Sequence, residues 1–134
     1  MDELLGQQPP FRFVDSLESY ADQEARVRFT PRKDGLLMEN GCLSAAGLLE
    51  HMAQANAARE GYRCKYVLHI PVSIGYIGQV RHYQVNRLPR IGEEIRTRVF
   101  LKQEIFGISL SDIEVRCGSE LLASASLKTA LADE

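Results

Sequence analysis

Cysteine and tryptophan are scarce in this chain of 134 residues, which contains no tryptophan and three cysteines, Cys42, Cys64 and Cys117. The odd number, and the absence of Cys-x-x-Cys or Cys/His ligand spacing, exclude a disulfide framework and a structural zinc site of the usual kind. Reduced thiols in a cytoplasmic protein are the simplest interpretation. Nothing in the sequence indicates a metal ion or a bound organic cofactor.

Long apolar runs and a strong charge of either sign are also missing. No stretch is long enough to span a bilayer, and residues 1–8 lack the basic and apolar regions of a secretory signal. The formal net charge of −2 gives no global attraction to nucleic acid or to an anionic membrane. With 45% hydrophobic and 25% charged residues, the chain is predicted to form a single globular domain, 1–134.

Alternating apolar and polar residues predict strands on both sides of one helical segment. Strands at 11–19 and 25–29 precede the helix, and residues 30–41 form a loop rich in turn formers. Four strands follow the helix, at 72–85, 95–102, 108–116 and 121–130. This order indicates an α+β domain with an antiparallel sheet.

The helix is predicted to begin at Ser44, a good N-cap residue, and to end near Gly61, a typical C-cap residue. Its many alanines indicate close packing on several sides, as when a sheet wraps around a helix. Glu50 and Gln54 lie one turn apart on the same face. Burying a carboxylate is costly unless it is paired or used, so Glu50 is a candidate functional residue.

The helix carries the run Leu49-Glu50-His51-Met52-Ala53-Gln54-Ala55, which is similar to the Glu-x-Met-Ala-Gln-Ala run of single-hotdog (3R)-hydroxyacyl-[acyl-carrier-protein] dehydratases. Two other segments resemble that family in the same order. Leu4-Leu5 with Pro10-Phe11 resembles its opening, although Gln7-Gln8 replaces a His-Arg pair. Residues 75–83, with the turn that follows, resemble the strand and Pro-Gly-Asp turn after the helix. The segment 41–48 looks like a divergent branch that accompanies synthesis of aryl polyene or flexirubin-type pigments.

The resemblance implies a hotdog fold, in which an antiparallel sheet wraps around one long central helix. It also implies a two-subunit site where a histidine removes the C2 proton of a 3-hydroxyacyl thioester and a helix carboxylate helps the 3-hydroxyl to leave as water. Glu50 matches the acid, Gln54 its neighbour, and Cys42 stands in the place of the catalytic histidine. Substrate-binding positions implied by the family are Ala45, Ala46 and Gly47, whose amides would hold the thioester carbonyl, and Gly75 and Gly78, beside which a pantetheine chain would pass.

The replacement of histidine by Cys42 weakens the expected reaction. A thiol with a pKa of ~8.5 is mostly protonated near neutral pH, and a well-placed general base is worth ~10²- to 10⁴-fold in rate. Cys42 is either a replacement base, an acyl-accepting nucleophile, or a small apolar side chain that fills the turn. His69 and His82, or less readily His51 because it projects away from Glu50, are alternative bases.

Three functions therefore remain open. The first is a dehydratase-like hydro-lyase of fatty-acid or polyene-type synthesis. The second is a non-catalytic hotdog partner of an active dehydratase, and the third is an acyl thioesterase, which the same fold supports. The resemblance implies a homodimer or a heterodimer with another hotdog protein, and an acyl carrier protein or CoA thioester as substrate. Docking charges for an acidic carrier are expected at Arg81, Arg87 or Arg90.

Overall fold

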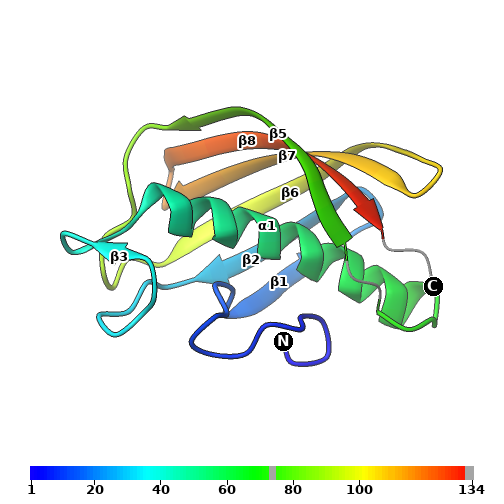
Figure 1. Cartoon of the computed structure of the whole chain (residues 1–134), viewed down its shortest axis with the longest axis horizontal. Coiled ribbons are helices and arrows are strands. Elements are labelled where there is room, and N and C mark those ends of the chain that lie inside the picture. The colour runs from blue at the N-terminus through cyan, green and yellow to red at the C-terminus, as the bar shows by residue number, and fades with distance from the viewer. Residues whose placement is uncertain (73–74, 132–134) are drawn as a thin grey trace.

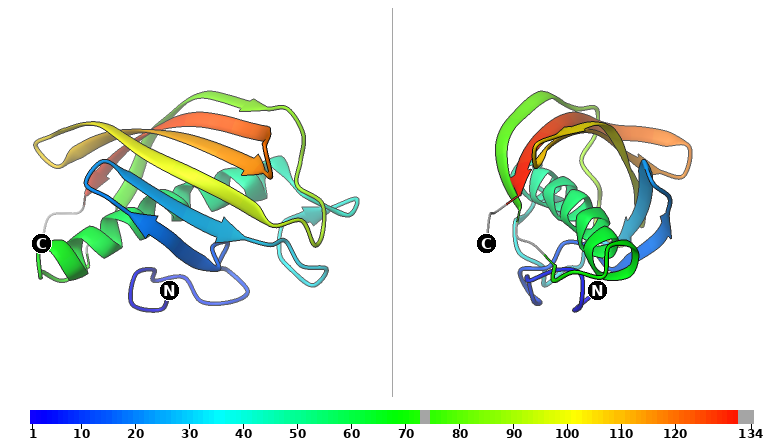
Figure 2. Two further views of the ribbon diagram at one scale, coloured as in Figure 1. Left: turned by 180° about the vertical axis from the view of Figure 1, so that it is seen from behind. Right: turned by 90° about the vertical axis from the view of Figure 1, so that its right-hand side faces the viewer.

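The computed structural model describes residues 1–72 and 75–131, and it shows one long helix lying against a curved antiparallel sheet (Figure 1). The helix α1 covers Ala45–Tyr62 and continues into a short π-helix, η1, at Arg63–Val67. The six strands of the sheet are, in spatial order, β1 (Ser16–Tyr20), β2 (Glu24–Phe29), β6 (Ile95–Ile105), β7 (Ile108–Cys117), β8 (Glu120–Leu131) and β5 (Gly75–Val85). The sheet curls around the helix in end view (Figure 2), which confirms the predicted α+β hotdog fold.

Packing on several sides of α1 explains its unusual composition. Ser44 caps the helix, because its hydroxyl accepts a hydrogen bond of 3.1 Å from the Gly47 amide. Beyond that cap, eleven residues of the helix are buried, and they include polar ones: Gly47, Leu48, His51, Met52, Gln54, Ala55, Asn56, Ala58, Arg59, Glu60 and Gly61. The helix is therefore enclosed, as its alanine content predicts, and polar side chains on it need partners inside the protein.

The helix α1 ends at Tyr62, one residue beyond the predicted end near Gly61, but Gly61 is not its C-cap residue. Gly61 lies inside α1, which runs to Tyr62 and then into η1. The glycine is there for close packing, since the N-terminal segment crosses the helix at this point with the backbone of Leu4 against it. Glycine at this position allows two backbones to approach without a side chain between them.

The first predicted strand, 11–19, is shorter in the structure, where β1 begins at Ser16. Residues 11–14 lie against the helix instead of pairing in the sheet, with Phe13 and Val14 buried, and the first backbone bond to β2 is that of the Asp15 N–H to the Arg28 carbonyl. The loop 30–41 and the start of the helix segment hold a small hairpin that the sequence did not predict, formed by β3 (Met38–Glu39) and β4 (Cys42–Leu43). Of the predicted strand 72–85, residues 75–85 form β5, whereas 73 and 74 lie outside the described residues.

The inner face of the sheet changes character along its length. Most of its inward residues are apolar and join α1 in one hydrophobic core, among them Val27, Val99, Ile113, Leu127 and Ala125. Near the C-terminal half of α1, however, the inward positions of β7 and β8 are the buried hydroxyl residues Ser109, Ser111 and Thr129. One end of the interior is thus polar.

Strand β5 forms one edge of the sheet and is almost wholly exposed. Large apolar side chains are exposed on it and on the segment that leads to it: Tyr66, Val67, Leu68, Ile70, Val72, Tyr76, Ile77, Val80 and Val85. Within residues 1–72 and 75–131, no helix combines the length and apolarity needed to cross a membrane.

Candidate active site

Gln54 fixes the carboxylate of Glu50 and ties the helix to the N-terminal segment. Its amide nitrogen donates to Glu50 Oε1 at 2.9 Å and to the Phe11 carbonyl at 2.8 Å. Its amide oxygen accepts from the Phe13 backbone N–H at 2.7 Å. These three bonds leave the buried Gln54 amide a single orientation, so Glu50 is presented in a fixed position. The predicted pairing of Glu50 with Gln54 one turn away is present.

Glu50 and Gln54 line a cavity of about 130 Å³ between α1, the N-terminal segment and the edge of the sheet. Its walls comprise Gln7, Glu50, Ala53, Gln54, Asn56, Ala57, Arg59, Glu60, Gly75, Ile77, Ser109 and Thr129. The volume is below the ~300–1,000 Å³ typical of sites that enclose a whole small ligand. The exposed edge strand β5 contributes Gly75 and Ile77 to its wall.

Cys42 does not line this cavity. It is partly buried in β4, paired with Glu39 across the small hairpin and bridged to Arg90. Among the described residues, the cavity wall includes neither a cysteine nor a histidine. The predicted catalytic pair Glu50 and Cys42 is therefore not brought together within one chain.

His51 is not available as a base, because both of its ring nitrogens are hydrogen-bonded inside the protein. Its ring is fully buried, with Nδ1 2.6 Å from the Phe13 carbonyl oxygen and Nε2 2.6 Å from the Thr97 hydroxyl. The carbonyl accepts only, so Nδ1 carries the proton and Nε2 accepts from Thr97. Burial lowers the pKa of His51 to about 4, against a smaller opposing effect of the Phe13 carbonyl. The other two histidines, His69 and His82, are exposed and do not line the cavity.

The amides at the start of α1 are only partly free. The Gly47 N–H, predicted to hold a thioester carbonyl, donates to the Ser44 hydroxyl instead. Gly47 serves packing, since a Cβ there would lie 2.6 Å from Leu43 Cδ1. Ala45 and Ala46 are exposed, and their amides have no acceptor within the part of the chain that the structure describes.

The two glycines predicted along the pantetheine path differ. Gly75 opens β5 and lines the cavity with Glu50. Gly78 does not line it; the β5–β8 register shifts between Ile77 and Gln79, which marks a bulge at Gly78. A Cβ at Gly78 would meet only Lys128 O at 3.7 Å, so no close backbone approach requires this glycine.

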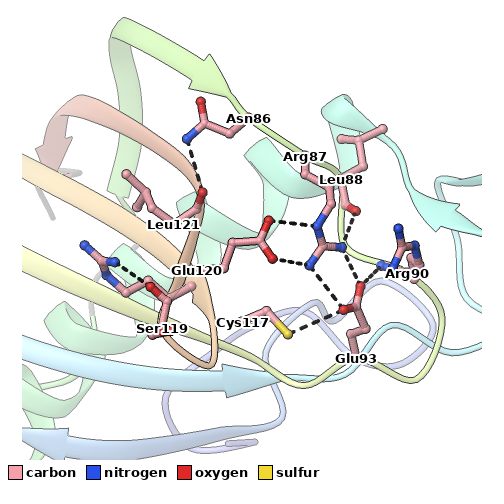
Figure 3. Close-up of polar contacts among 10 residues, drawn as sticks. Asn86, Arg87, Leu88, Arg90, Glu93, Cys117, Ser119, Glu120 and Leu121 are labelled. Carbon is pink, nitrogen blue, oxygen red and sulfur yellow. Dashed lines mark hydrogen bonds and ion pairs between the residues drawn. The ribbon is translucent and has the colours of Figure 1, made fainter.

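Arg87 is engaged inside the fold and is not a free docking charge. It forms paired hydrogen bonds with Glu93 and with Glu120, at 2.7–3.2 Å (Figure 3). Glu93 also accepts from the Arg90 main-chain N–H and from the Cys117 thiol. The Arg87 guanidinium lowers the pKa of Glu93 to about 2, and burial raises the pKa of the Cys117 thiol. This cluster joins the turn after β5 to the β7–β8 hairpin.

Several residues of the cavity wall were not predicted from the sequence. Arg59 and Asn56 are charged or polar residues in a helix, where a solvated face is the ordinary interpretation, yet both are buried at the polar end of the cavity. Gln7 also lines the cavity. The only feature of the sequence that pointed to Gln7 is that it stands in place of the family's His-Arg pair. No group of three or more His, Cys, Asp or Glu side chains placed to hold a metal occurs among residues 1–72 and 75–131.

A curved antiparallel sheet around a central helix, with a fixed carboxylate in the N-terminal half of that helix, defines a hotdog-fold protein with a candidate acid. The sequence matches the ApeP-like family, described as ApeP dehydratase, over residues 1–134, and the chain belongs to that family. No curated protein matches the sequence.

Solved structures with the same fold include a chain of the dehydratase heterocomplex ApeI:P from Xenorhabdus doucetiae. It superposes with a TM-score of 0.89 at 19% identity, covering 99% of this chain and 91% of that one. The smu.793 protein from Streptococcus mutans UA159, bound to acetyl CoA, gives a TM-score of 0.74 at 11% identity, covering 97% of each chain. A hypothetical thioesterase with coenzyme A from Streptococcus pneumoniae TIGR4 gives 0.71 at 9% identity, covering 89% of this chain and 86% of that one.

Proposed function

We propose that this chain is a dehydratase subunit that binds a 3-hydroxyacyl thioester and supplies the acid for the elimination of water, while a second hotdog chain supplies the base. The observation that carries the proposal is Glu50, held by Gln54 on a cavity wall that has neither a histidine nor a cysteine among its described residues. The dehydratase family and the likeness to a chain of a dehydratase heterocomplex support it.

In the proposed reaction a base of the partner takes the C2 proton of the substrate. The C–H electron pair forms the C2–C3 double bond as the C3–O bond breaks. The 3-hydroxyl leaves with a proton delivered from Glu50, and the products are an enoyl thioester and water. Gln54 donates to Oε1 of Glu50, so Oε2 is the oxygen that we expect to face the leaving 3-hydroxyl.

The substrate thioester carbonyl would gain negative charge as C2 loses its proton. The free first-turn amides of Ala45 and Ala46 point to such a role, because helix N-terminal N–H groups stabilise developing oxyanions. The carrier of the acyl group is an acyl carrier protein or CoA, in fatty-acid or polyene-type synthesis. Arg81 and Arg90, which are exposed, are the candidate docking charges that remain after Arg87 is assigned to the fold.

The decisive experiment measures enoyl formation from a 3-hydroxyacyl-carrier protein by this chain alone and by its mixture with an active hotdog dehydratase. We expect activity in the mixture to exceed the sum of the separate activities. Glu50→Gln in this chain should remove that gain, whereas the matched change Glu39→Gln, on the exposed hairpin, should retain it. Full activity of the isolated chain that is lost in Cys42→Ala would instead establish Cys42 as the base of a homodimer.

The same mixtures distinguish a thioesterase. Release of free thiol from acyl-CoA without enoyl formation would contradict the dehydratase proposal. Activity of the mixture that is unchanged by Glu50→Gln would leave this chain as a non-catalytic partner only.

A further inference from the structure

The hairpin that joins β6 to β7 presents an aromatic ring to solvent from a strained backbone position. Phe106 is 99% exposed and has a φ of 52°. Together with Gly107 it forms the two-residue turn between the paired residues Ile105 and Ile108. Such turns favour Asn-Gly, because a bulky residue strains a backbone of positive φ. The sequence therefore places Phe106 at the tip despite two unfavourable terms, the strain and the exposure of the ring.

An apolar row crosses the outer face of the sheet beside this turn. Its members are paired in register across four strands: Ile105, Ile108, Ala130 and Tyr76. They face away from α1, because their neighbours Ser109 and Thr129 are buried on the inner face. The three large side chains of the row are between 43% and 61% exposed. The outer face of an antiparallel sheet is ordinarily polar, so this row marks an interaction surface.

Two cations border the apolar row. Lys128 and Arg81 line one depression of about 360 Å³ together with the hairpin tip. The remaining wall of the depression is largely apolar and comprises Gln103, Ile105, Phe106, Ile108 and Leu110. This outer surface therefore combines an apolar end with a cationic border, and it lies on the opposite face of the sheet from the Glu50 cavity.

The charges around the tip indicate the sign of the partner. The two carboxylates closest to the tip in sequence are already paired, Glu104 with Arg63 at 2.8 Å and Asp112 with Lys102 at 3.6 Å. The two cations of the depression form no ion pair within residues 1–72 and 75–131. An anionic partner would meet unpaired positive charge there, whereas the same surface of a second copy would be repelled.

The order of the apolar and cationic groups favours a membrane over a protein groove. The yellow and orange hairpin extends past the nearby ends of β5 and β8 (Figure 1), so its tip can enter a flat surface. Lys128 is paired with Leu110, two residues behind Ile108, and so lies about 7 Å behind the apolar row. A bilayer has the same order, with anionic headgroups a few ångströms outside its hydrocarbon.

We propose that the β6–β7 hairpin inserts Phe106 into an anionic membrane surface, where Lys128 and Arg81 bind lipid phosphates. The contact is peripheral and is confined to this end of the molecule, since the net charge of −2 gives the chain as a whole no attraction to such a surface. The inference goes beyond the proposed function, and it holds whichever reaction the Glu50 cavity performs.

The first test measures co-sedimentation of the full chain with vesicles, alone and in its mixture with an active hotdog dehydratase. Vesicles of phosphatidylcholine are compared with vesicles of equal parts phosphatidylcholine and phosphatidylglycerol. We expect about tenfold tighter binding to the anionic vesicles, as two cations near an anionic surface provide, and weaker binding as salt is raised. Equal binding to both kinds of vesicle, or binding to neither, would overturn the proposal.

A second test locates the inserted residue. The chain contains no tryptophan, so a single one at the tip reports its own surroundings. The fluorescence of Phe106→Trp should shift to shorter wavelength with anionic vesicles and be quenched by lipids brominated on their acyl chains. Ile91→Trp places the same ring at an exposed position beyond the other end of β6 and should not respond. No shift in Phe106→Trp, or equal shifts in both variants, would contradict insertion of the tip.

Two further variants separate the apolar and charged contributions. Phe106→Asn gives the turn its preferred residue, so it should unfold in urea no earlier than the unaltered protein, yet bind anionic vesicles at least about fivefold more weakly. Lys128→Gln should also weaken that binding, whereas Lys33→Gln, an equal change of charge on an exposed loop, should not. Unchanged binding in Phe106→Asn would overturn the proposal. Binding of an acidic carrier protein that is lost in Phe106→Asn, without any vesicle binding, would assign this surface to a protein instead.

Discussion

The carbonyl oxygen of Leu4 lies 2.5 Å from the place where a Cβ at Gly61 would begin. Backbone on both sides leaves no flexible group that could move aside. We therefore expect Gly61→Ala to lower the free energy of unfolding by about 1–3 kcal/mol, as overpacking does in cores. Urea unfolding measures the change. Gly78→Ala is the matched control, because its nearest atom is 3.7 Å away; a similar loss in both would contradict this interpretation.

Replacing Gln54 by Glu tests the donor nitrogen of Gln54, which holds both the Glu50 carboxylate and the Phe11 carbonyl. Gln54→Glu retains an acceptor for the Phe13 N–H but places a second carboxylate where the donor to Glu50 stood. We expect about a 10²-fold loss of dehydration rate in the subunit mixture, as for a misplaced catalytic group. Gln23→Glu, on an exposed turn, is the control. Unchanged rates in Gln54→Glu would mean that Glu50 needs no positioning.

The buried His51 predicts a loss of stability in mild acid. Its pKa is about 4 in the folded protein against a usual 6.5, so the unfolded chain binds the proton more readily between these values. The stability contribution of neutral His51 is therefore complete above pH 6.5 and is lost as the pH falls toward 4, by roughly 3 kcal/mol in total.

Unfolding free energies measured from pH 7.5 to 4 should accordingly decrease in the unaltered protein. His51→Gln removes the titrating group and should flatten that decrease, even if the variant is less stable throughout. His82→Gln, at an exposed position, should retain the full slope. An unaltered slope in His51→Gln would assign the acid sensitivity to carboxylates.

The Arg87 cluster predicts a specific carboxyl titration. Glu93 has a pKa of about 2 beside Arg87, so its contribution to stability is present above its usual 4.5 and is lost as the pH falls toward 2. In Arg87→Met the pKa of Glu93 should rise toward 4.5, as measured by NMR. Arg90→Met should leave it near 2, because Arg90 contributes through its main-chain N–H. A low Glu93 pKa that persists in Arg87→Met would contradict this assignment.

Local chemistry made part of the molecule predictable. The N-cap at Ser44 and the Glu50–Gln54 pair follow from helical spacing alone, and alternation located the strands after the helix. The family resemblance added the wrapped sheet. Those features depend on residues close in sequence or on a shared pattern.

Other features depend on contacts between distant segments, which no local pattern encodes. Gly61 resembles a helix C-cap in the sequence, because no residue near it indicates that the backbone of Leu4 packs against it. Residues 11–15 alternate between apolar and polar as a strand does. The buried Gln54 side chain, however, bonds to the Phe11 carbonyl and the Phe13 N–H and holds this segment against the helix. Arg59 looks like a solvated helix residue until the sheet encloses it.

The exposed edge strand β5 has a consequence for how this protein is made in a cell. One side of this eleven-residue strand has no strand partner among the described residues, next to the exposed Tyr76, Ile77 and Val80, and an edge of this kind pairs readily with other chains. A newly synthesised copy without its partner would therefore be prone to aggregation and to degradation. If the proposed partner covers this edge, the amount of either protein that survives is set by the supply of the other.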